Sequence, residues 1–170
     1  PNGFYFDYDG IGNHPYHHAG MIYIQEPAAM VPVESIEIQK HWKVLDLCAA
    51  PGGKSTLISQ FLGAKGLLVS NEVVRQRVFV LSENMQKWGN GNTVVTHNQP
   101  ADFAANLPGV FDCILVDAPC SGEGMFRKDE VAVSQIRAKS AEATLFLRCI
   151  REEDLYAGLE KIKAIGKKYG

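Results

Sequence analysis

The chain has 170 residues, of which 46% are hydrophobic and 21% charged, and its formal net charge is −2 at pH 7. This size and composition predict one ordinary globular core, and the near-neutral charge argues against binding nucleic acid through bulk electrostatics. No segment approaches the ~20 consecutive apolar residues that span a bilayer and no charged-then-apolar leader is found, so we expect no membrane partner.

The four cysteines show neither a CxxC pair nor zinc-like spacing with the histidines. They are Cys48, Cys113, Cys120 and Cys149. We therefore predict no disulfide scaffold and no metal, and free thiols favour a reducing compartment, the cytoplasm. His14, His17 and His18 lie close in sequence without a suitably spaced carboxylate or thiol, which favours a surface or substrate-facing role over metal ligation.

The N-terminal part of the chain has few regular patterns. Residues 1–20 are rich in Gly, Asn, His and aromatic residues and favour a loop or hairpin region. Residues 21–24 can form a strand, and a helix is expected to begin within 25–33. We expect residues 1–40 to lead into the core.

Residues 43–56 carry the main motif. The apolar run at 44–47 predicts a strand, Pro51-Gly52-Gly53 a tight turn, and the following residues a helix over about 54–63. Such a turn places unpaired backbone N–H groups and a helix N-terminus at the carboxyl end of a strand, where an open α/β sheet binds its ligand. The expected ligand is a nucleotide or a nucleotide-like cofactor.

Two alternatives to a cofactor turn remain open. Gly53-Lys54-Ser55 resembles the end of a phosphate-binding P-loop, G-x-x-x-x-G-K-[ST]. That motif needs Gly where this chain has Cys48, and Pro51 removes one N–H donor, so a triphosphate site is the weaker interpretation. The other alternative is a turn shaped only for packing of the strand against the helix.

The second predicted strand, at 67–70, is followed by an acidic residue. Glu72 lies 19 positions after Gly53, where nucleotide-binding folds hydrogen-bond ribose hydroxyls. The alternative is that the Glu72 charge favours the dipole of the next helix. That helix is predicted over 73–88, and its basic residues at 75–77 are interpreted as a solvated face.

Three further elements are predicted before a second motif. They are a strand at 93–96, a short helix near 101–106 and a buried strand at 111–116. Four strands alternating with helices predict an α/β fold with a doubly wound sheet.

After the last strand, Asp117 and Cys120 would lie at the carboxyl edge beside the glycine turn. A thiol in such a polar loop can act as a nucleophile or acid–base partner, although Asp117 also suits the metal-binding acid of a nucleotide triphosphatase.

Residues 44–56 and 117–129, with Gln25-Glu26-Pro27 ahead of them, resemble the Nop/Sun family of S-adenosylmethionine-dependent RNA cytosine methyltransferases, most closely the bacterial ribosomal RNA branch. The resemblance runs from about residue 4 to residue 129. It implies a Rossmann-like methyltransferase core over 41–135 and S-adenosylmethionine as the cofactor. It also implies methylation of carbon 5 of an unpaired or flipped cytidine in RNA, with ribosomal RNA the expected partner.

The resemblance further implies which residues form the site. The expected cofactor-binding residues are Cys48, Ala49, Ala50, Pro51, Gly52, Gly53, Lys54, Glu72, Gln99 and Asp117. Gln99 falls at the family's adenine-contacting position, which is usually acidic, and Asp117 would lie between cofactor and target base. Lys54, Arg127 and Lys128 are candidates for RNA phosphates.

The chemistry needs a thiolate, because carbon 5 of cytosine is a poor nucleophile until a thiolate adds to carbon 6. In the family a Pro-Cys cysteine, matching Cys120, assists release, and the attacking cysteine lies in a Thr-Cys motif on the next strand. No Thr-Cys follows Gln135 here, and Cys149 is the thiol placed to substitute. We therefore expect an incomplete sheet and an atypical helical segment over 136–170. A non-catalytic cofactor- or RNA-binding module stays open as the alternative.

Overall fold

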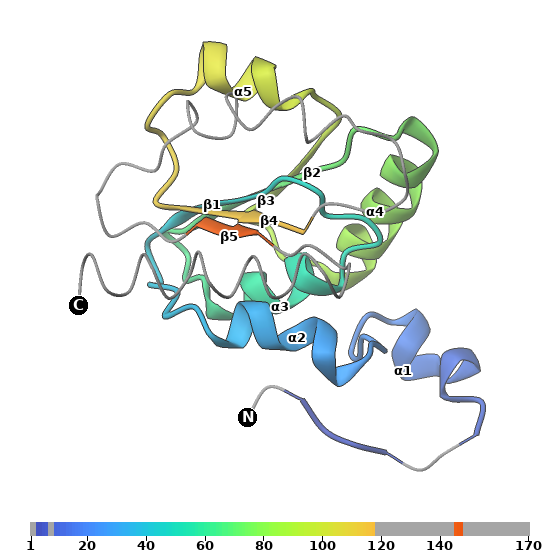
Figure 1. Ribbon diagram of the computed structural model, residues 1–170. Coiled ribbons are helices and arrows are strands. Elements are labelled where there is room, and N and C mark those ends of the chain that lie inside the picture. Colours follow the sequence, from blue (N-terminus) through green and yellow to red (C-terminus); the bar gives the residue numbers. More distant parts are fainter. Residues whose placement is uncertain (1–2, 7–8, 118–144, 148–170) are drawn as a thin grey trace, which may run out of the picture.

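The computed structural model describes residues 3–6, 9–117 and 145–147 (Figure 1). Within these residues, five parallel strands form one sheet in the order β3-β2-β1-β4-β5. The strands are β1 (Lys43–Asp46), β2 (Leu67–Asn71), β3 (Thr93–Thr96), β4 (Cys113–Val116) and β5 (Leu145–Leu147). The order reverses direction between β1 and β4, and a doubly wound sheet binds its ligands at such a switch point.

The helices are the 3-10 helix η1 (Ile11–Asn13) and the α-helices α1 (Pro15–His18), α2 (Pro27–Glu34), α3 (Gly53–Phe61), α4 (Arg75–Trp88) and α5 (Pro100–Asn106). Of these, α2, α3 and α4 lie on one face of the sheet and α5 on the other (Figure 1). Alternate residues of β1 point to opposite faces, so Val44 packs with the buried residues of α2, α3 and α4. Leu45 packs with Phe103 of α5 and Phe111 on the other face. The near-continuous apolar strands are therefore explained by burial on both sides.

The turn between β1 and α3 depends on glycine. Gly52 precedes α3 with a φ of 117°, a left-handed conformation that strains other residues. Ser55, Thr56 and Leu57 then enter α3 buried. The predicted strand, turn and helix are confirmed, with the strand ending at Asp46 and the helix at Phe61.

Several sequence predictions for the ends of the chain need correction. The strand expected at 21–24 is wrong, because these residues belong to no strand of the sheet. Part of the region expected to be a loop or hairpin, residues 11–18, forms η1 and α1 instead. The strand β5, inside the segment expected to be helical, was not predicted, and it pairs with β4. The C-terminal helix expected at 152–168 lies outside the described residues, and the boundaries 1–40, 41–135 and 136–170 stay predictions. Among the helices that the structure describes, none is long and apolar enough to cross a membrane.

Candidate functional site

The carboxyl ends of β1, β2 and β4 bring three predicted site segments to one edge of the sheet. Asp46 of β1 pairs with Ser70 of β2 and with Leu115 of β4. Beyond the last pairs, the Ala49 N–H donates to the Asn71 carbonyl at 2.8 Å, and the Leu47 N–H donates to the Leu115 carbonyl at 2.9 Å. The glycine turn, Glu72 and Asp117 therefore follow directly from three adjacent strands.

An ion pair joins the glycine turn to the end of β4. Lys54 Nζ lies 2.6 Å from Asp117 Oδ2, and both side chains are largely buried, with 17% and 14% exposed. Asp117 Oδ1 is buried and has no hydrogen-bond partner among the described residues. The Lys54 ammonium therefore pairs with Asp117 in this structure. The sequence had also made Lys54 a candidate for contact with an RNA phosphate, which stays a prediction.

Glu72 is buried and supports the beginning of α4. Its Oε1 accepts from the Val74 N–H at 2.9 Å, and its Oε2 forms an ion pair with Arg77 Nη1 at 3.1 Å. The Arg77 contact lacks the alignment of a hydrogen bond, so Oε2 keeps acceptor capacity. The Val74 contact is the local helix-supporting role that the sequence allowed as an alternative. It leaves the ribose role of Glu72 a prediction.

Two side chains of α4 hold the glycine turn in place. Arg77 Nη2 donates to the Ala50 carbonyl at 2.5 Å, and Asn84 Nδ2 donates to the Pro51 carbonyl at 2.7 Å. The interpretation of residues 75–77 as a solvated face is therefore wrong for Arg77, which bridges Glu72 and the turn. The missed signal was a basic residue in the first turn of α4, five residues after the buried acid.

Asn71 organises the ends of three strands. Its Nδ2 donates to the carbonyls of Leu47 and Asn98 at 3.2 and 3.0 Å. Its Oδ1 accepts from Thr96 Oγ1 and from the Asn98 N–H, both at 2.9 Å. An amide of this kind can make four hydrogen bonds, and Asn71 makes all four while fully buried. The loop after β3 is thereby held beside Glu72.

Asp46 is a buried acid that the sequence did not single out. Its Oδ2 accepts from Ser55 Oγ at 2.7 Å, and Ser55 Oγ in turn accepts from Ser70 Oγ at 2.8 Å. Its Oδ1 is buried with no hydrogen-bond partner in the part of the chain that the structure describes. Burial raises the pKa of Asp46 to about 6, although the Ser55 hydrogen bond and the Lys54 charge oppose the shift.

The Cys48 thiol, in the loop after β1, is buried and uncharged. Burial, and then the charges of Asp46 and Glu72, raise the pKa of the Cys48 thiol far above its ordinary value. The thiolate is the nucleophilic form of cysteine, so Cys48 does not meet the requirement for a nucleophile. Cys113 lies in β4, where burial raises its pKa to about 11.

The remaining predicted residues are placed less centrally or lie outside the described part. Gln99 is exposed before α5, and its backbone N–H donates to Asp102 Oδ2 at 2.9 Å. Its predicted adenine contact stays a prediction. The other predicted residues, Cys120, Arg127, Lys128 and Cys149, lie outside the described residues. In the described ranges, no three His, Cys, Asp or Glu side chains are arranged to hold a metal ion.

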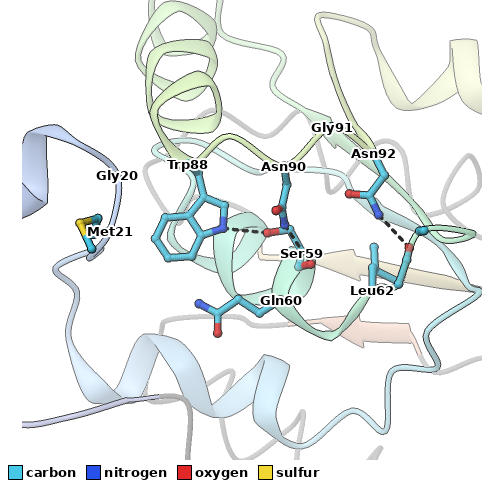
Figure 2. A pocket seen from close by; sticks show the side chains of 11 residues that line it. Gly20, Met21, Ser59, Gln60, Leu62, Trp88, Asn90, Gly91 and Asn92 are labelled. Atoms are coloured by element: carbon cyan, nitrogen blue, oxygen red, sulfur yellow. Dashed lines mark hydrogen bonds between the residues drawn. The ribbon is translucent and has the colours of Figure 1, made fainter.

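A cavity of about 880 Å³ lies at the opposite edge of the sheet, beside the C-terminal ends of α3 and α4 (Figure 2). Its polar side chains serve the protein itself, because Trp88 Nε1 donates to Ser59 Oγ at 3.0 Å and Asn90 Nδ2 donates to the Ser59 carbonyl at 3.0 Å. Asn92 Nδ2 likewise donates to the Gly63 carbonyl. No lining residue is titratable, and the cavity contains none of the residues of the glycine turn, Glu72 or Asp117. The lining residues are Gly20, Met21, Ser59, Gln60, Leu62, Gly63, Ala64, Trp88, Asn90, Gly91 and Asn92.

The sequence matches known proteins over most of its length. Residues 33–167 match the family model of the 16S rRNA methyltransferase RsmB/F. The chain is 46% identical over 126 residues to the ribosomal RNA small subunit methyltransferase F of Pectobacterium carotovorum subsp. carotovorum, covering 73% of this chain and 26% of that protein. It is 40% identical over 148 residues to the protein of the same name from Vibrio cholerae serotype O1, covering 84% and 31%. The chain therefore spans less than a third of the length of these two relatives.

Solved structures are similar as well. The crystal structure of NSun6 from Pyrococcus horikoshii with SFG superimposes with a TM-score of 0.59 at 28% identity, covering 64% of this chain and 28% of that one. A methyltransferase homolog protein from the same organism has a TM-score of 0.57 at 29% identity, covering 74% and 41%.

Proposed function

Because the chain belongs to the RsmB/F family of 16S rRNA methyltransferases, we propose that it binds S-adenosylmethionine and transfers a methyl group to carbon 5 of a cytidine in ribosomal RNA. The observation that carries the proposal is the meeting of the glycine turn, Glu72 and Asp117 at the carboxyl edge of β1, β2 and β4. The family gives no support to the P-loop alternative. The engagement of Lys54 with Asp117 also argues against a lysine free for a triphosphate.

The charge of the site suits this cofactor. Three buried or largely buried acids carry an oxygen without a hydrogen-bond partner among the described residues, namely Asp46 Oδ1, Glu72 Oε2 and Asp117 Oδ1. Buried acceptors are costly unless they find partners, and a ligand with positive charge and hydroxyl groups supplies them. S-adenosylmethionine has a sulfonium, an ammonium and two ribose hydroxyls. We assign the ribose hydroxyls to Glu72, the methionine end and ribose to the segment 48–54, and the adenine to Gln99.

The residues of the chain would divide the chemistry as follows. S-adenosylmethionine, when bound, supplies an electrophilic methyl group. Asp117 holds the edge of the target cytosine, and a thiolate adds to carbon 6 so that carbon 5 becomes nucleophilic. Once carbon 5 carries the methyl group, a base removes the carbon 5 proton and the bond between carbon 6 and the thiolate breaks. Cys120 assists this release of the base, and Cys149 is the candidate for the attacking thiol. Both cysteines lie outside the described residues, so their roles rest on the sequence alone.

The substrate follows from the chemistry of the site. A base inside a duplex cannot reach such a pocket, so the target cytidine is unpaired or flipped. Arg127 and Lys128, seven and eight residues after Cys120, would contact the RNA phosphates and position the strand. We place the protein in the cytoplasm, where ribosomal RNA of bacteria is modified.

A second candidate function is binding without catalysis. The observation that favours it is that the two cysteines in the described residues, Cys48 and Cys113, are buried and have raised pKa values, so neither is a ready nucleophile. In that case, the chain would bind S-adenosylmethionine or RNA but transfer no methyl group.

Calorimetric titration with S-adenosylmethionine, beside ATP with magnesium, tests the proposal. We expect saturable S-adenosylmethionine binding that Glu72→Gln weakens about tenfold, the size of one hydrogen bond to a charged group. Glu72→Gln keeps an acceptor for the Val74 N–H, and Glu83→Gln, an exposed acid on α4, is the matched control. No binding by the unmodified chain, or binding of ATP alone, would overturn the proposal. Transfer of a labelled methyl group to ribosomal RNA then separates catalysis from binding alone.

A further inference from the structure

Residues 20–25, here named the strap, run along α3 in the opposite direction. Gly20 lies so close to the Lys87 carbonyl, at the C-terminal end of α4, that no Cβ would fit between them. Met21 lines the same cavity as Trp88 and as Ser59 of α3, and Figure 2 shows it on the Trp88 side of that cavity. At the other end, Gln25 contacts Gly53, the first residue of α3. The strap therefore begins at the amino edge of the sheet and ends at the glycine turn.

The dimensions of the strap agree with this course. Six extended residues reach about 20 Å at ~3.3 Å per residue, and nine helical residues span about 13 Å at ~1.5 Å per residue. Residues 22–26 have no regular secondary structure and belong to no strand, so the course of the strap is set by its contacts near the two ends of α3. Tyr23, on the same strap, is partly buried, which raises its pKa.

Gly53 is the point where the strap meets the site. A Cβ at Gly53 would lie 2.5 Å from Gln25 Oε1 and 3.1 Å from Tyr23 Cε1. The side chains of Gln25 and Tyr23 therefore lie directly against the backbone of the second glycine of the turn. The Gln25 carboxamide makes no hydrogen bond to any described residue, although its burial is intermediate. A half-turn of its terminal group exchanges oxygen and nitrogen, so it can present an N–H donor to a ligand.

We propose that Gln25 is a cofactor-contacting residue, and that its carboxamide donates a hydrogen bond to the α-carboxylate of S-adenosylmethionine beside the first turn of α3. This inference rests on the proposed function and adds the recognition of one end of the cofactor. The α-carboxylate is the anionic end of the ligand, and it would be repelled by the acids Asp46, Glu72 and Asp117.

The first turn of α3 provides the complementary environment for that carboxylate. Its backbone N–H groups carry the positive end of the helix dipole, and its preceding residue, Gly52, has no side chain to cap them. The Lys54 ammonium is paired with Asp117, so it leaves room for a neutral donor to complete the carboxylate contacts. Gln25 lies next to this turn and has donors to offer.

Comparison of S-adenosylmethionine with its decarboxylated form tests the inference, because the two ligands differ only in the carboxylate. Isothermal titration of the full chain should show that Gln25→Ala weakens S-adenosylmethionine binding about tenfold, the size of one hydrogen bond to a charged group. Binding of decarboxylated S-adenosylmethionine should not change. Gln25→Glu, which places a second carboxylate there, should weaken S-adenosylmethionine binding further and spare the decarboxylated form.

The outcomes separate this inference from the proposed function. If Gln25→Ala binds S-adenosylmethionine as tightly as the unmodified chain, the Gln25 contact is refuted while the proposed function stands. Equal weakening of both ligands would also refute it, since a structural role of the strap predicts that result. Failure of the unmodified chain to bind S-adenosylmethionine would overturn the proposed function first. Gln60→Ala, an exposed amide at the far end of α3, is the matched control and should bind both ligands normally.

Discussion

Lys54 Nζ lies 2.6 Å from Asp117 Oδ2, and this ion pair joins the first turn of α3 to the end of β4. The two residues are 63 positions apart in sequence. The pair spans the switch point between β1 and β4, where the strand order of the sheet reverses. It therefore sets the position of Asp117 relative to the glycine turn.

Removing the Lys54 charge should destabilise the chain. Lys54→Met leaves a largely buried carboxylate unpaired, which costs about 1–3 kcal/mol of unfolding free energy. Urea denaturation measures this change, and titration should show weaker S-adenosylmethionine binding. Lys87→Met is the control, because Lys87 forms an exposed pair with Glu83 and its loss should change the unfolding free energy far less than Lys54→Met. Equal effects of the two substitutions would contradict a positioning role for Lys54.

Arg77 and Arg75 should differ sharply although they lie two residues apart. Arg77→Ala removes the ion pair with the buried Glu72 and the donor to the Ala50 carbonyl. Arg77 itself is partly exposed, so its ion pair with Glu72 is not fully buried. We therefore expect the free energy of unfolding to fall by about 1–3 kcal/mol, less than for a fully buried pair. Arg75→Ala, on the exposed side of α4, should change unfolding free energy by less than about 0.5 kcal/mol. Thermal unfolding of both variants tests the difference.

Asp46 should make the stability of the unliganded chain depend on pH. Its folded-state pKa of about 6 lies above its ordinary value of 3.8, so the folded chain binds more protons between these values. The contribution of Asp46 to the free energy of unfolding is therefore fully present below about pH 4 and is lost as the pH rises through 6. Asp46→Asn keeps an acceptor for Ser55 and should gain about 1–3 kcal/mol relative to the unmodified chain at pH 8, a unit of pKa being ~1.4 kcal/mol.

Urea denaturation between pH 4 and pH 8 measures that gain. The difference between Asp46→Asn and the unmodified chain should shrink as the pH falls below about 6. A difference that is the same at every pH would show that Asp46 does not titrate in this range.

Cys48 should be chemically inert. Burial and the neighbouring acids raise the pKa of the Cys48 thiol. We therefore expect that iodoacetamide at pH 8 does not alkylate Cys48 in the folded chain, and mass spectrometry of the peptides measures this reaction. Cys113, buried in β4, should behave alike, and both should react after unfolding in urea. Cys48→Ala should bind S-adenosylmethionine with an affinity within about threefold of the unmodified chain, since only neutral contacts change. Rapid alkylation of Cys48 in the folded chain would contradict the buried, neutral thiol.

The local pattern of the sequence determined most of the sheet. The four strands from β1 to β4 and the helices α3, α4 and α5 were predicted to within a few residues, because buried parallel strands and glycine turns leave strong local signals. The motif also placed the glycine turn, Glu72 and Asp117 at one edge, since parallel strands end on the same side.

Only the tertiary structure decided which side chains meet there. Arg77 reaches Glu72 and Ala50 because α4 packs beside the turn, and a sequence pattern cannot distinguish that face from a solvated one. Residues 21–24 were mistaken for a strand because their apolar residues resemble one, whereas their contacts lie near the ends of α3 and not in the sheet. The strand β5 was missed because its three residues form a pattern too short to detect, and its pairing with β4 defines it. Periodicity reports which residues are buried, but the partner of a buried side chain is set by elements that are distant in sequence.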